Sequence, residues 1–429
     1  MFSTLRNAWK VPDIRKKMIY TILMLIVYRI GTHVPVPGVN AEEVSKIITN
    51  SSLGSFIDLF AGGGLAKLSL FALGIVPYVT GSIIMNLLTM ALPPLERMSK
   101  EGPEGRKKIA SITRYVGVAL GLIQAIGVLI TLNATAVATG TNVFLSTGTP
   151  AILNYITIVL ALTAGTALIM WIGEHITENG VGNGISLIIF VSIVSRFPSA
   201  VIGFIKNIEM GTMSIITFII VAVAALAIVT GIVFIDLGER RIPVQYAKRV
   251  IGRKIYGGQS THIPMKINSS GVLPLIFAMT LVQFPGMIMQ MFTSKEGQAA
   301  YEAVMGSSQP LYLVLFALLI FFFTFFYSQV TFNPVDVSKN LQQNGGFIPG
   351  IRAGKPTSDY LQKILVRVTL FGAIFLALVA TVPTVFAALA GFSSPFGATS
   401  LLIMVSVSLE TTRQLESHMM MRHYKGFLK

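Results

Sequence analysis

Long apolar runs alternate with shorter polar segments along almost the whole chain. Each run is roughly 16 to 26 residues long, and a helix needs about 20 apolar residues to cross the hydrocarbon core of a bilayer. The runs lack the ten-residue alternation that is typical of outer-membrane barrel strands. The pattern therefore predicts an all-α polytopic membrane protein with ten transmembrane helices. The predicted spans are residues 18–36, 75–92, 113–133, 151–172, 184–204, 213–235, 271–292, 310–330, 365–390 and 396–411.

The composition agrees with this class of protein. Of the 429 residues, 53% are hydrophobic and only 12% are charged, whereas an average soluble domain carries about 25% charged residues. The chain has no cysteine, which excludes disulfides, thiolate metal sites and thiol catalysis. Residues 1–17 are basic and precede an apolar run that contains Arg29 but no small-residue cleavage site. We therefore expect an uncleaved first span.

The positive charges predict that both termini lie in the cytoplasm. If the chain starts inside, 27 of the 33 Lys and Arg residues fall in cytoplasmic segments, as the positive-inside rule requires. These segments include the N-terminus 1–17, the long loops 236–270 and 331–367, and the tail 412–429. The loop 173–183 carries no Lys or Arg, but it is too short to reverse the orientation. The position of the charges is thus more informative than their formal net sum of +15.

Ten spans with both ends on one side divide into two halves of five, which we expect at residues 18–204 and 213–411. Because five is odd, the two halves are inserted with opposite orientation. If they share a fold, they are related by a pseudo-twofold axis in the membrane plane, and a pathway commonly runs along such an interface. The sequence shows no clear internal repeat, so this symmetry rests on geometry alone.

The loop between residues 239 and 268 has the period of a β-strand. Apolar side chains recur at every second position from Ile242 to Tyr246, and a second extended stretch, THIPMKI, follows. The pattern predicts a basic hairpin with Arg253 and Lys254 near its tip. These charges either serve only as a topological anchor or form a docking surface for an acidic partner such as RNA or an acidic protein patch.

A second long cytoplasmic loop contains turn-forming residues at nearly every third position. The string NGGFIPGIRAGKPT presents Arg352 from a Gly- and Pro-rich turn. From composition alone, this arginine is either a solvated loop residue or a functional one.

Catalytic motifs are absent from the sequence. The five histidines form no HExxH pair, no GxSxG occurs, and the GVGNG string lacks the strand-turn-helix context of a nucleotide loop. No span carries a central Asp or Glu, which weighs against a proton-coupled carrier. Arg29 and Arg196 lie near span ends, where an arginine can snorkel to the interface. A secondary solute transporter is the alternative class and needs a polar midplane site; an intramembrane enzyme needs a nucleophile and base or a metal set.

The remaining polar residues within the spans are mostly neutral. Asn86 and Thr280 are examples, and hydrogen bonding between helices is the plain explanation for them. Gly117 and Gly121 form a GxxxG pair, which permits close helix contact. An apolar pore can still act as a gate, because a hydrophobic constriction excludes ions by dewetting.

One segment fits neither a span nor a loop. FIDLFAGGGLAKLSLF, residues 56–71, carries Asp58, Lys67 and three consecutive glycines. It is too interrupted to cross a bilayer and too apolar to be an ordinary solvated loop.

Seven gapless strings, in order along the chain, carry a family resemblance. They are RIGTHVPVPGV (29–39), GGGLAKLSLFALGIVPYVTGSIIMNLL (62–88), GNGIS (182–186), QSTHIPMKIN (259–268), FNP (332–334), FIPGIRAGK (347–355) and GATSLLI (397–403). The chain resembles the SecY family, the pore subunits of the bacterial Sec protein-translocation channel, from about residue 15 to residue 424.

The resemblance implies a fold, a function and partners. The expected fold is two inverted five-helix halves around a central hourglass pore, with a plug segment at about 54–70 and a lateral gate. Unfolded secretory chains cross through the pore, and transmembrane segments leave sideways into the lipid of the bacterial cytoplasmic membrane. SecE and SecG are the expected membrane partners, and SecA or a translating ribosome supplies the driving force. The channel itself hydrolyses nothing and needs no cofactor or metal.

The resemblance also assigns site residues. The pore ring falls on Ile75, Val79, Ile189, Ile276 and Ile403. The polar contacts of the lateral gate fall on Asn86 and Thr280. Docking of SecA or the ribosome falls on Arg253, Lys254 and Arg352. The plug falls on Phe56, Ile57, Asp58, Leu59, Phe60, Gly62, Gly63, Gly64 and Leu65.

The plug assignment explains the unusual composition of residues 56–71. Its apolar residues are expected to pack against the ring, and its glycines lower helix stability by roughly 1 kcal/mol each relative to Ala. Asp58 and Lys67 are expected to face the watery outer vestibule. The alternative is a re-entrant packing segment with no gating role. Val79 replaces a frequent Ile of the family, so we expect a slightly wider or softer ring.

Overall fold

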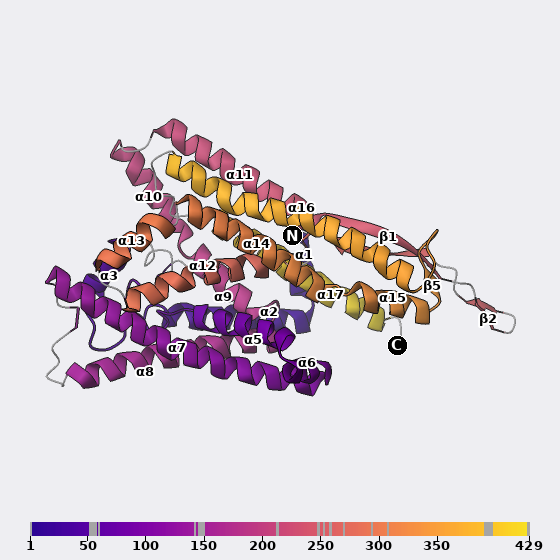
Figure 1. Cartoon of the computed structure of the whole chain (residues 1–429), viewed down its shortest axis with the longest axis horizontal. Helices are drawn as coiled ribbons and strands as arrows, with labels where there is room; N and C mark the ends of the chain where they lie inside the picture. The colour runs from indigo at the N-terminus through magenta and orange to yellow at the C-terminus, as the bar shows by residue number, and fades with distance from the viewer. Residues whose placement is uncertain are drawn as a thin grey trace. The chain divides into compact units, whose positions relative to one another are not determined.

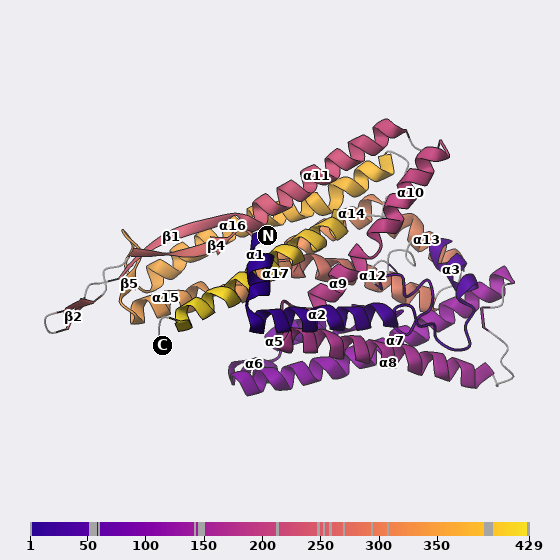
Figure 2. The same ribbon diagram turned by 180° about the vertical axis from the view of Figure 1, so that it is seen from behind.

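The computed structural model describes residues 2–50, 58, 61–140, 143–144, 151–211, 214–246, 249–251, 254–256, 260–268, 271–292, 295–306, 309–389 and 398–426. Helices predominate among these residues (Figures 1 and 2). The helices are α1 (Phe2–Lys10), α2 (Pro12–Gly31), α3 (Ala41–Asn50), α5 (Val76–Ala91), α6 (Pro93–Lys100), α7 (Pro103–Thr139), α8 (Ala151–Asn179), α9 (Gly184–Val194), α10 (Phe197–Glu209), α11 (Ile215–Leu237), α12 (Leu273–Phe292), α13 (Lys295–Met305), α14 (Pro310–Thr331), α15 (Pro334–Gln343), α16 (Lys355–Leu389) and α17 (Ala398–Gly426). The strands are β1 (Glu239–Tyr246), β2 (Arg249–Ile251), β3 (Lys254–Tyr256), β4 (Ser260–Lys266) and β5 (Gly346–Phe347).

Each predicted apolar run overlaps a helix, although residues 32–36 of the first run lie beyond the end of α2 and the run 184–204 is divided between α9 and α10. In the described part of the chain, six helices are long and apolar enough to cross a membrane. α5 and α6, which meet at a bend of 98°, make a seventh if they form one span. The bend has a local cause, because Leu92 precedes Pro93 and is extended at φ −106° and ψ 114°, as a residue before proline prefers. The helical, polytopic class is thereby confirmed.

Several helices extend beyond the apolar runs that predict them. α7 begins at Pro103, α8 continues to Asn179 and α17 continues to Gly426. The expected loop 173–183 is therefore mostly helical. An apolar run marks the part of a helix that meets lipid, whereas a polar extension into water leaves no hydropathy signal.

The chain forms two compact units. The first contains Met1–Phe218, Thr280–Gln309 and Val407–Lys429, and the second contains Ile219–Met279 and Pro310–Ser406. α12 and α17 each contribute residues to both units.

In the first unit, α5, α7 and α8 pack side by side (Figure 2). A Cβ atom added at Gly81 of α5 would lie 3.1 Å from the backbone nitrogen of Gly117, and one added at Gly121 would lie 3.3 Å from Thr166 Cγ2 on α8. The GxxxG pair of α7 thus allows close helix contact on two sides, as expected. The core of this unit contains side chains from residues 36–162, including Val44 and Ile48 of α3, a short helix that the apolar runs did not predict.

The second unit contains the basic hairpin that the alternating pattern predicts. β1 pairs antiparallel with β4, so that Ile242 faces Ile263 across the ladder, and β5 joins the other edge of β1. Ile242 and Val244 are buried in an apolar cluster with Leu361 and Leu365 of α16. The sheet is therefore fixed to a long helix, and Figure 1 shows α11 and α16 running beside each other toward it.

Candidate functional site

In the predicted plug segment, Asp58 is helical, and the residues that follow the gap at 59–60 form turns. Residues 61–75 form consecutive turns rather than a regular helix, and Gly62 and Gly63 have φ of +63° and +88°. Glycine adopts this left-handed conformation without a Cβ penalty. The expectation that the glycines serve to weaken a helix is therefore wrong for residues 61–75, where they instead permit the turns. Phe56, Ile57, Leu59 and Phe60 lie outside the described residues.

Gly62 also permits a close approach to two other elements. A Cβ atom there would lie 3.2 Å from Arg29 Nη1 and 3.3 Å from Ser192 Cα. Gly64 is similarly confined, since its Cβ would lie 2.7 Å from Ser69 Oγ. The neighbouring Leu65 is buried in the core of the first unit.

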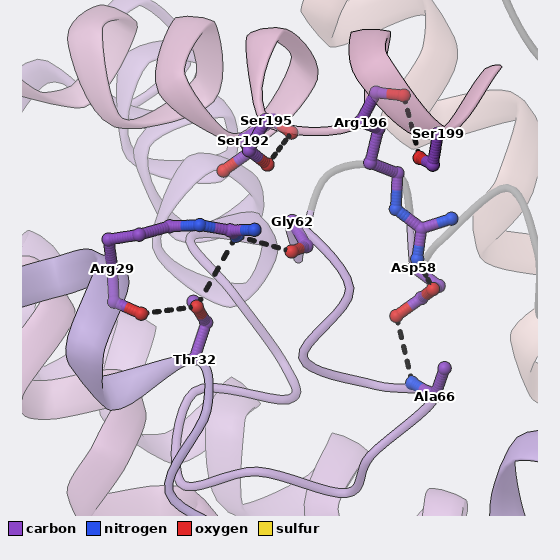
Figure 3. A network of polar contacts seen from close by, with 9 residues as sticks. All are labelled: Arg29, Thr32, Asp58, Gly62, Ala66, Ser192, Ser195, Arg196 and Ser199. Atoms are coloured by element: carbon purple, nitrogen blue, oxygen red, sulfur yellow. Dashed lines mark hydrogen bonds and ion pairs between the residues drawn. The ribbon is translucent and has the colours of Figure 1, made fainter. Parts of the chain in front are cut away.

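Asp58 organises this turn with its carboxylate and its main chain (Figure 3). Its Oδ1 accepts a hydrogen bond from the Ala66 amide at 2.8 Å, and its carbonyl oxygen accepts one from the Gly63 amide at 3.0 Å. Its Oδ2 forms an ion pair with Arg196 Nη2. Asp58 is only 2% exposed. The expectation that it faces the outer vestibule is therefore wrong, because a carboxylate with these partners is satisfied inside the fold. Lys67 is exposed, as expected.

A second arginine contacts the turn. Arg29, in the last turn of α2, donates from Nη1 to the Gly62 carbonyl oxygen at 2.6 Å. It also donates to Thr32 Oγ1 at 3.4 Å, and Thr32 Oγ1 donates back to the Arg29 carbonyl at 2.7 Å. Figure 3 shows Arg29 beside Gly62 and Arg196 beside Asp58, so the segment is held by two guanidinium groups, one from α2 and one from the break between α9 and α10.

Apolar and hydroxyl contacts complete this support. The Tyr28 hydroxyl and Ser192 Oγ share a hydrogen bond of 2.6 Å between α2 and α9. The Tyr28 ring stacks on Phe71 with ring centroids 5.8 Å apart. Gly31 makes room for that ring, since a Cβ there would lie 2.0 Å from Phe71 Cε2.

The GNGIS string has a structural role at the start of α9. Asn183 caps the helix, and its Oδ1 accepts hydrogen bonds from Ile185 N at 3.0 Å and Ser186 N at 3.3 Å, which satisfies otherwise unpaired amides. Gly182 has φ +86°, a conformation that suits glycine. The cap fixes where α9 begins and therefore where Ile189 lies.

The five positions assigned to the pore ring are all buried. Ile75 is 2% exposed, Val79 6%, Ile189 1%, Ile276 8% and Ile403 0%. In the first compact unit, Ile75 directly precedes α5, Val79 lies on α5 and Ile189 lies on α9. In the second compact unit, Ile276 lies on α12 and Ile403 lies on α17.

The remaining assigned residues lie elsewhere on the chain. Asn86 is exposed on α5, Thr280 is half-buried on α12, and both make contacts with other groups. Arg352 is exposed between Gly350 and Gly354, whose φ values are +82° and +97°. Its carbonyl oxygen accepts a hydrogen bond from Thr357 Oγ1 at 2.8 Å, which fixes the turn that presents it. Lys254 lies on β3, and Arg253 lies outside the described residues.

Sequence reasoning found most members of the Arg29 and Asp58 network but not their pairing. Tyr28, Ser192 and the Ala66 amide gave no signal, because a hydroxyl or a backbone group in an apolar run is ordinary. The isolated charges did give a signal that they interact. Asp58, Arg29 and Arg196 are rare charged residues in apolar surroundings, and such residues usually pair with one another.

Comparison with known proteins agrees with this architecture. The SecY family profile matches residues 69–412. The protein translocase subunit SecY of Streptomyces coelicolor is 44% identical over 440 residues, which covers 100% of both chains. A solved SecY structure, whose plug domain is described as stabilising the closed state of the translocation channel, superposes with a TM-score of 0.65 at 18% identity and covers 94% of this chain and 92% of the other. Sec61 in a canine ribosome-channel complex superposes with a TM-score of 0.60 at 17% identity and the same coverage.

The fold and these relatives define the class of protein: a helical, polytopic, protein-conducting channel of the membrane. The chain belongs to the SecY family, and it functions as a translocation channel subunit rather than as an enzyme.

Proposed function

We propose that the chain forms the pore of a Sec channel in a bacterial cytoplasmic membrane, with both termini in the cytoplasm. Unfolded secretory polypeptides pass through its centre, and transmembrane segments leave sideways into lipid through a gate that includes Asn86 and Thr280. SecE and SecG are its membrane partners, and SecA or a translating ribosome supplies the driving force. The two halves, 18–204 and 213–411, are inverted five-helix bodies that separate when the channel opens.

The observation that carries the proposal is the chemistry of the five ring positions. Four are isoleucine and one is valine, and none is more than 8% exposed. Aliphatic side chains make a dry collar that excludes ions by dewetting. They offer a passing polypeptide no hydrogen bond, and their small branches deform around side chains of different size. Val79 lacks one methylene relative to isoleucine and makes the ring slightly wider or softer.

The segment near residues 54–70 acts as the plug below this ring. The turn that contains Gly62 is held by Arg29 of α2, and Asp58 is held by Arg196, which directly precedes α10. Such a segment can be displaced as one piece. The plug domain named for the solved SecY relative supports this assignment.

The cytoplasmic loops serve as the docking surface. Arg352 is exposed on a fixed turn, and Lys254 lies on β3; by sequence, Arg253 directly precedes it. Positive charges on a rigid projection suit an acidic partner, RNA or protein. A structural relative, Sec61, is described in a canine ribosome-channel complex, which supports a ribosome as one of the partners.

A reconstitution experiment tests the proposal. The chain is purified with its membrane partners and placed in vesicles, and SecA, ATP and an unfolded secretory protein are added. We expect the secretory protein to become protease-protected in an ATP-dependent way, while small solutes such as amino acids and sugars are not accumulated. Solute accumulation without protein translocation would instead support the secondary-transporter class.

A further inference from the structure

We propose that Asp58 and Arg196 are specificity-determining residues, which form a latch that sets how readily the plug leaves its resting position. The strength of this latch determines how apolar a signal segment must be to open the channel. The inference rests on the proposed function and deepens it, since it names the contact that regulates the plug.

The first step is the local integrity of the turn. Asp58 binds the Ala66 amide through Oδ1 and the Gly63 amide through its carbonyl oxygen. These bonds lie within the plug segment and move with it. The second carboxylate oxygen, Oδ2, is thereby left to pair with Arg196, which belongs to a different element.

The second step is the rigidity of the partner. Arg196 lies in the break between α9 and α10, and its carbonyl oxygen accepts a hydrogen bond from Ser199 Oγ at 2.8 Å. The preceding Ser195 donates from Oγ to the Ser192 carbonyl at 2.8 Å. Both bonds fix the backbone beneath the guanidinium group. The latch therefore joins the plug segment, which moves, to the Arg196 backbone, which is held in place by hydrogen bonds.

The third step is the asymmetry of a buried ion pair. Removing one partner while the other stays buried is strongly unfavourable, whereas exposing both to water recovers their hydration and costs little. The Asp58 side chain is 3% exposed and that of Arg196 is 30% exposed. A small fluctuation that separates the pair leaves Asp58 unpaired inside the fold and is resisted. Full displacement of the plug into the aqueous vestibule hydrates both groups and is allowed.

The fourth step is the connection to the ring. α9 carries Ile189 one turn before Ser192, and Ser192 contacts both Tyr28 and the Gly62 position. Arg196 follows the end of the same helix. A signal segment that shifts α9 therefore acts on the ring and on the latch together. The apolar contact that the signal supplies has to overcome the latch, which links latch strength to signal stringency.

The experiment uses the full chain, co-purified with its membrane partners and reconstituted. Three variants are compared with the parent: Asp58→Asn, Arg196→Gln and the double variant. Asp58→Asn keeps an oxygen for the Ala66 amide and replaces the oxygen that faces Arg196 with an uncharged NH2 group, and Arg196→Gln leaves Asp58 itself intact. Glu43→Gln is the control, because the Glu43–Lys46 pair at 2.7 Å lies in α3 and Lys46 is 67% exposed.

Three readouts are measured: hydrogen exchange at the Ala66 amide, resting ion conductance, and export of a reporter with a shortened apolar signal. We expect each single variant to raise resting conductance and the Ala66 exchange rate by about tenfold, a change worth about 1.4 kcal/mol. We also expect each to admit the defective signal. The double variant should be no worse than either single one, because both remove the same interaction. Glu43→Gln should match the parent.

Two outcomes overturn the latch: single variants that match the parent in conductance and in exchange, or single effects that add in the double variant. If Arg196→Gln does not assemble, Asp58→Asn carries the test by itself, and an Ala66 exchange rate equal to the parent's again overturns the latch. The proposed function fails separately, through a parent complex that does not translocate protein, and Ala66 exchange reports on the latch in that case as well.

Discussion

Asp236, in the last turn of α11, accepts a hydrogen bond of 2.6 Å from Ser406 Oγ on α17. Its other carboxylate oxygen accepts one of 2.7 Å from Asn268 Nδ2, just after β4. One carboxylate thus ties the base of the basic hairpin to the helix that carries Ile403, three residues before Ser406. The hairpin therefore has a direct polar connection to α17, the helix that carries the proposed ring position Ile403.

Replacing Asp236 with alanine should loosen the hairpin. The change leaves two donors without their acceptor, and each lost hydrogen bond of this kind costs about 1–3 kcal/mol. We expect faster proteolysis within residues 239–266, a lower melting temperature and weaker SecA-driven translocation. Arg241→Gln is the control. It removes an ion pair of the same hairpin, because Arg241 and Glu239 both lie on β1, but that pair is exposed. Proteolysis rates that are equal in the Asp236→Ala variant and the parent would contradict this connection.

Replacing Gly62 with alanine should disturb the plug turn. Alanine at φ +63° adopts the left-handed region, at a cost of roughly 1–2 kcal/mol, and its Cβ crowds Arg29 Nη1. We expect a higher resting conductance. Gly203→Ala is the matched control: Gly203 lies inside α10, and a Cβ atom added there meets nothing within 4 Å, so alanine should be neutral or stabilising. Equal conductance in the two variants would argue against a strained, closely packed turn.

Polar replacement of Ile403 should weaken the seal. Asparagine at this fully buried position adds hydrogen-bonding groups that favour water in the constriction, which opposes dewetting. We expect higher ion conductance and export of proteins with defective signals. Ile403→Leu keeps the volume and the apolar surface, so it should behave as the parent does. The ring assignment is wrong if Ile403→Asn changes neither conductance nor signal stringency.

Reversing the charge of Arg352 should block translocation without unfolding the chain. Arg352 is exposed, and its turn is held through backbone atoms that glutamate retains, so the fold and SecE binding should persist. Lys206→Glu makes the same change of charge on the exposed face of α10, and it should have no effect on SecA-driven translocation. Normal ATP-dependent translocation by Arg352→Glu vesicles would remove this residue from the docking surface.

The sequence predicts the helical class and the hairpin well, because hydropathy and a period of two are local signals. It predicts α3 poorly, since that helix is short and amphipathic and gains its stability from burying Val44 and Ile48. The environment of Asp58 was predicted wrongly because it too depends on a contact between residues that are far apart in the sequence. Its carboxylate is buried only because Arg196, 138 positions along the chain, lies beside it. No local pattern reports a contact of that kind.

The ring positions show the opposite case. Aliphatic residues are abundant in every span, so composition does not distinguish Ile189 from its neighbours. The family resemblance selects the five positions, and the structure adds that each is buried. Direct contact between these positions and a translocating polypeptide is therefore the decisive observation.

Site-specific photocrosslinking provides that observation. A photoreactive residue is placed at Ile189 or Ile403, and in a control variant at Ile220, which is 62% exposed on α11. A secretory polypeptide is then arrested midway through the reconstituted channel. The account predicts crosslinks from residues 189 and 403 to the arrested polypeptide and none from residue 220. Crosslinks from residue 220 alone, or from none of the three while the polypeptide is verifiably arrested in the membrane, would contradict a polypeptide path through this ring.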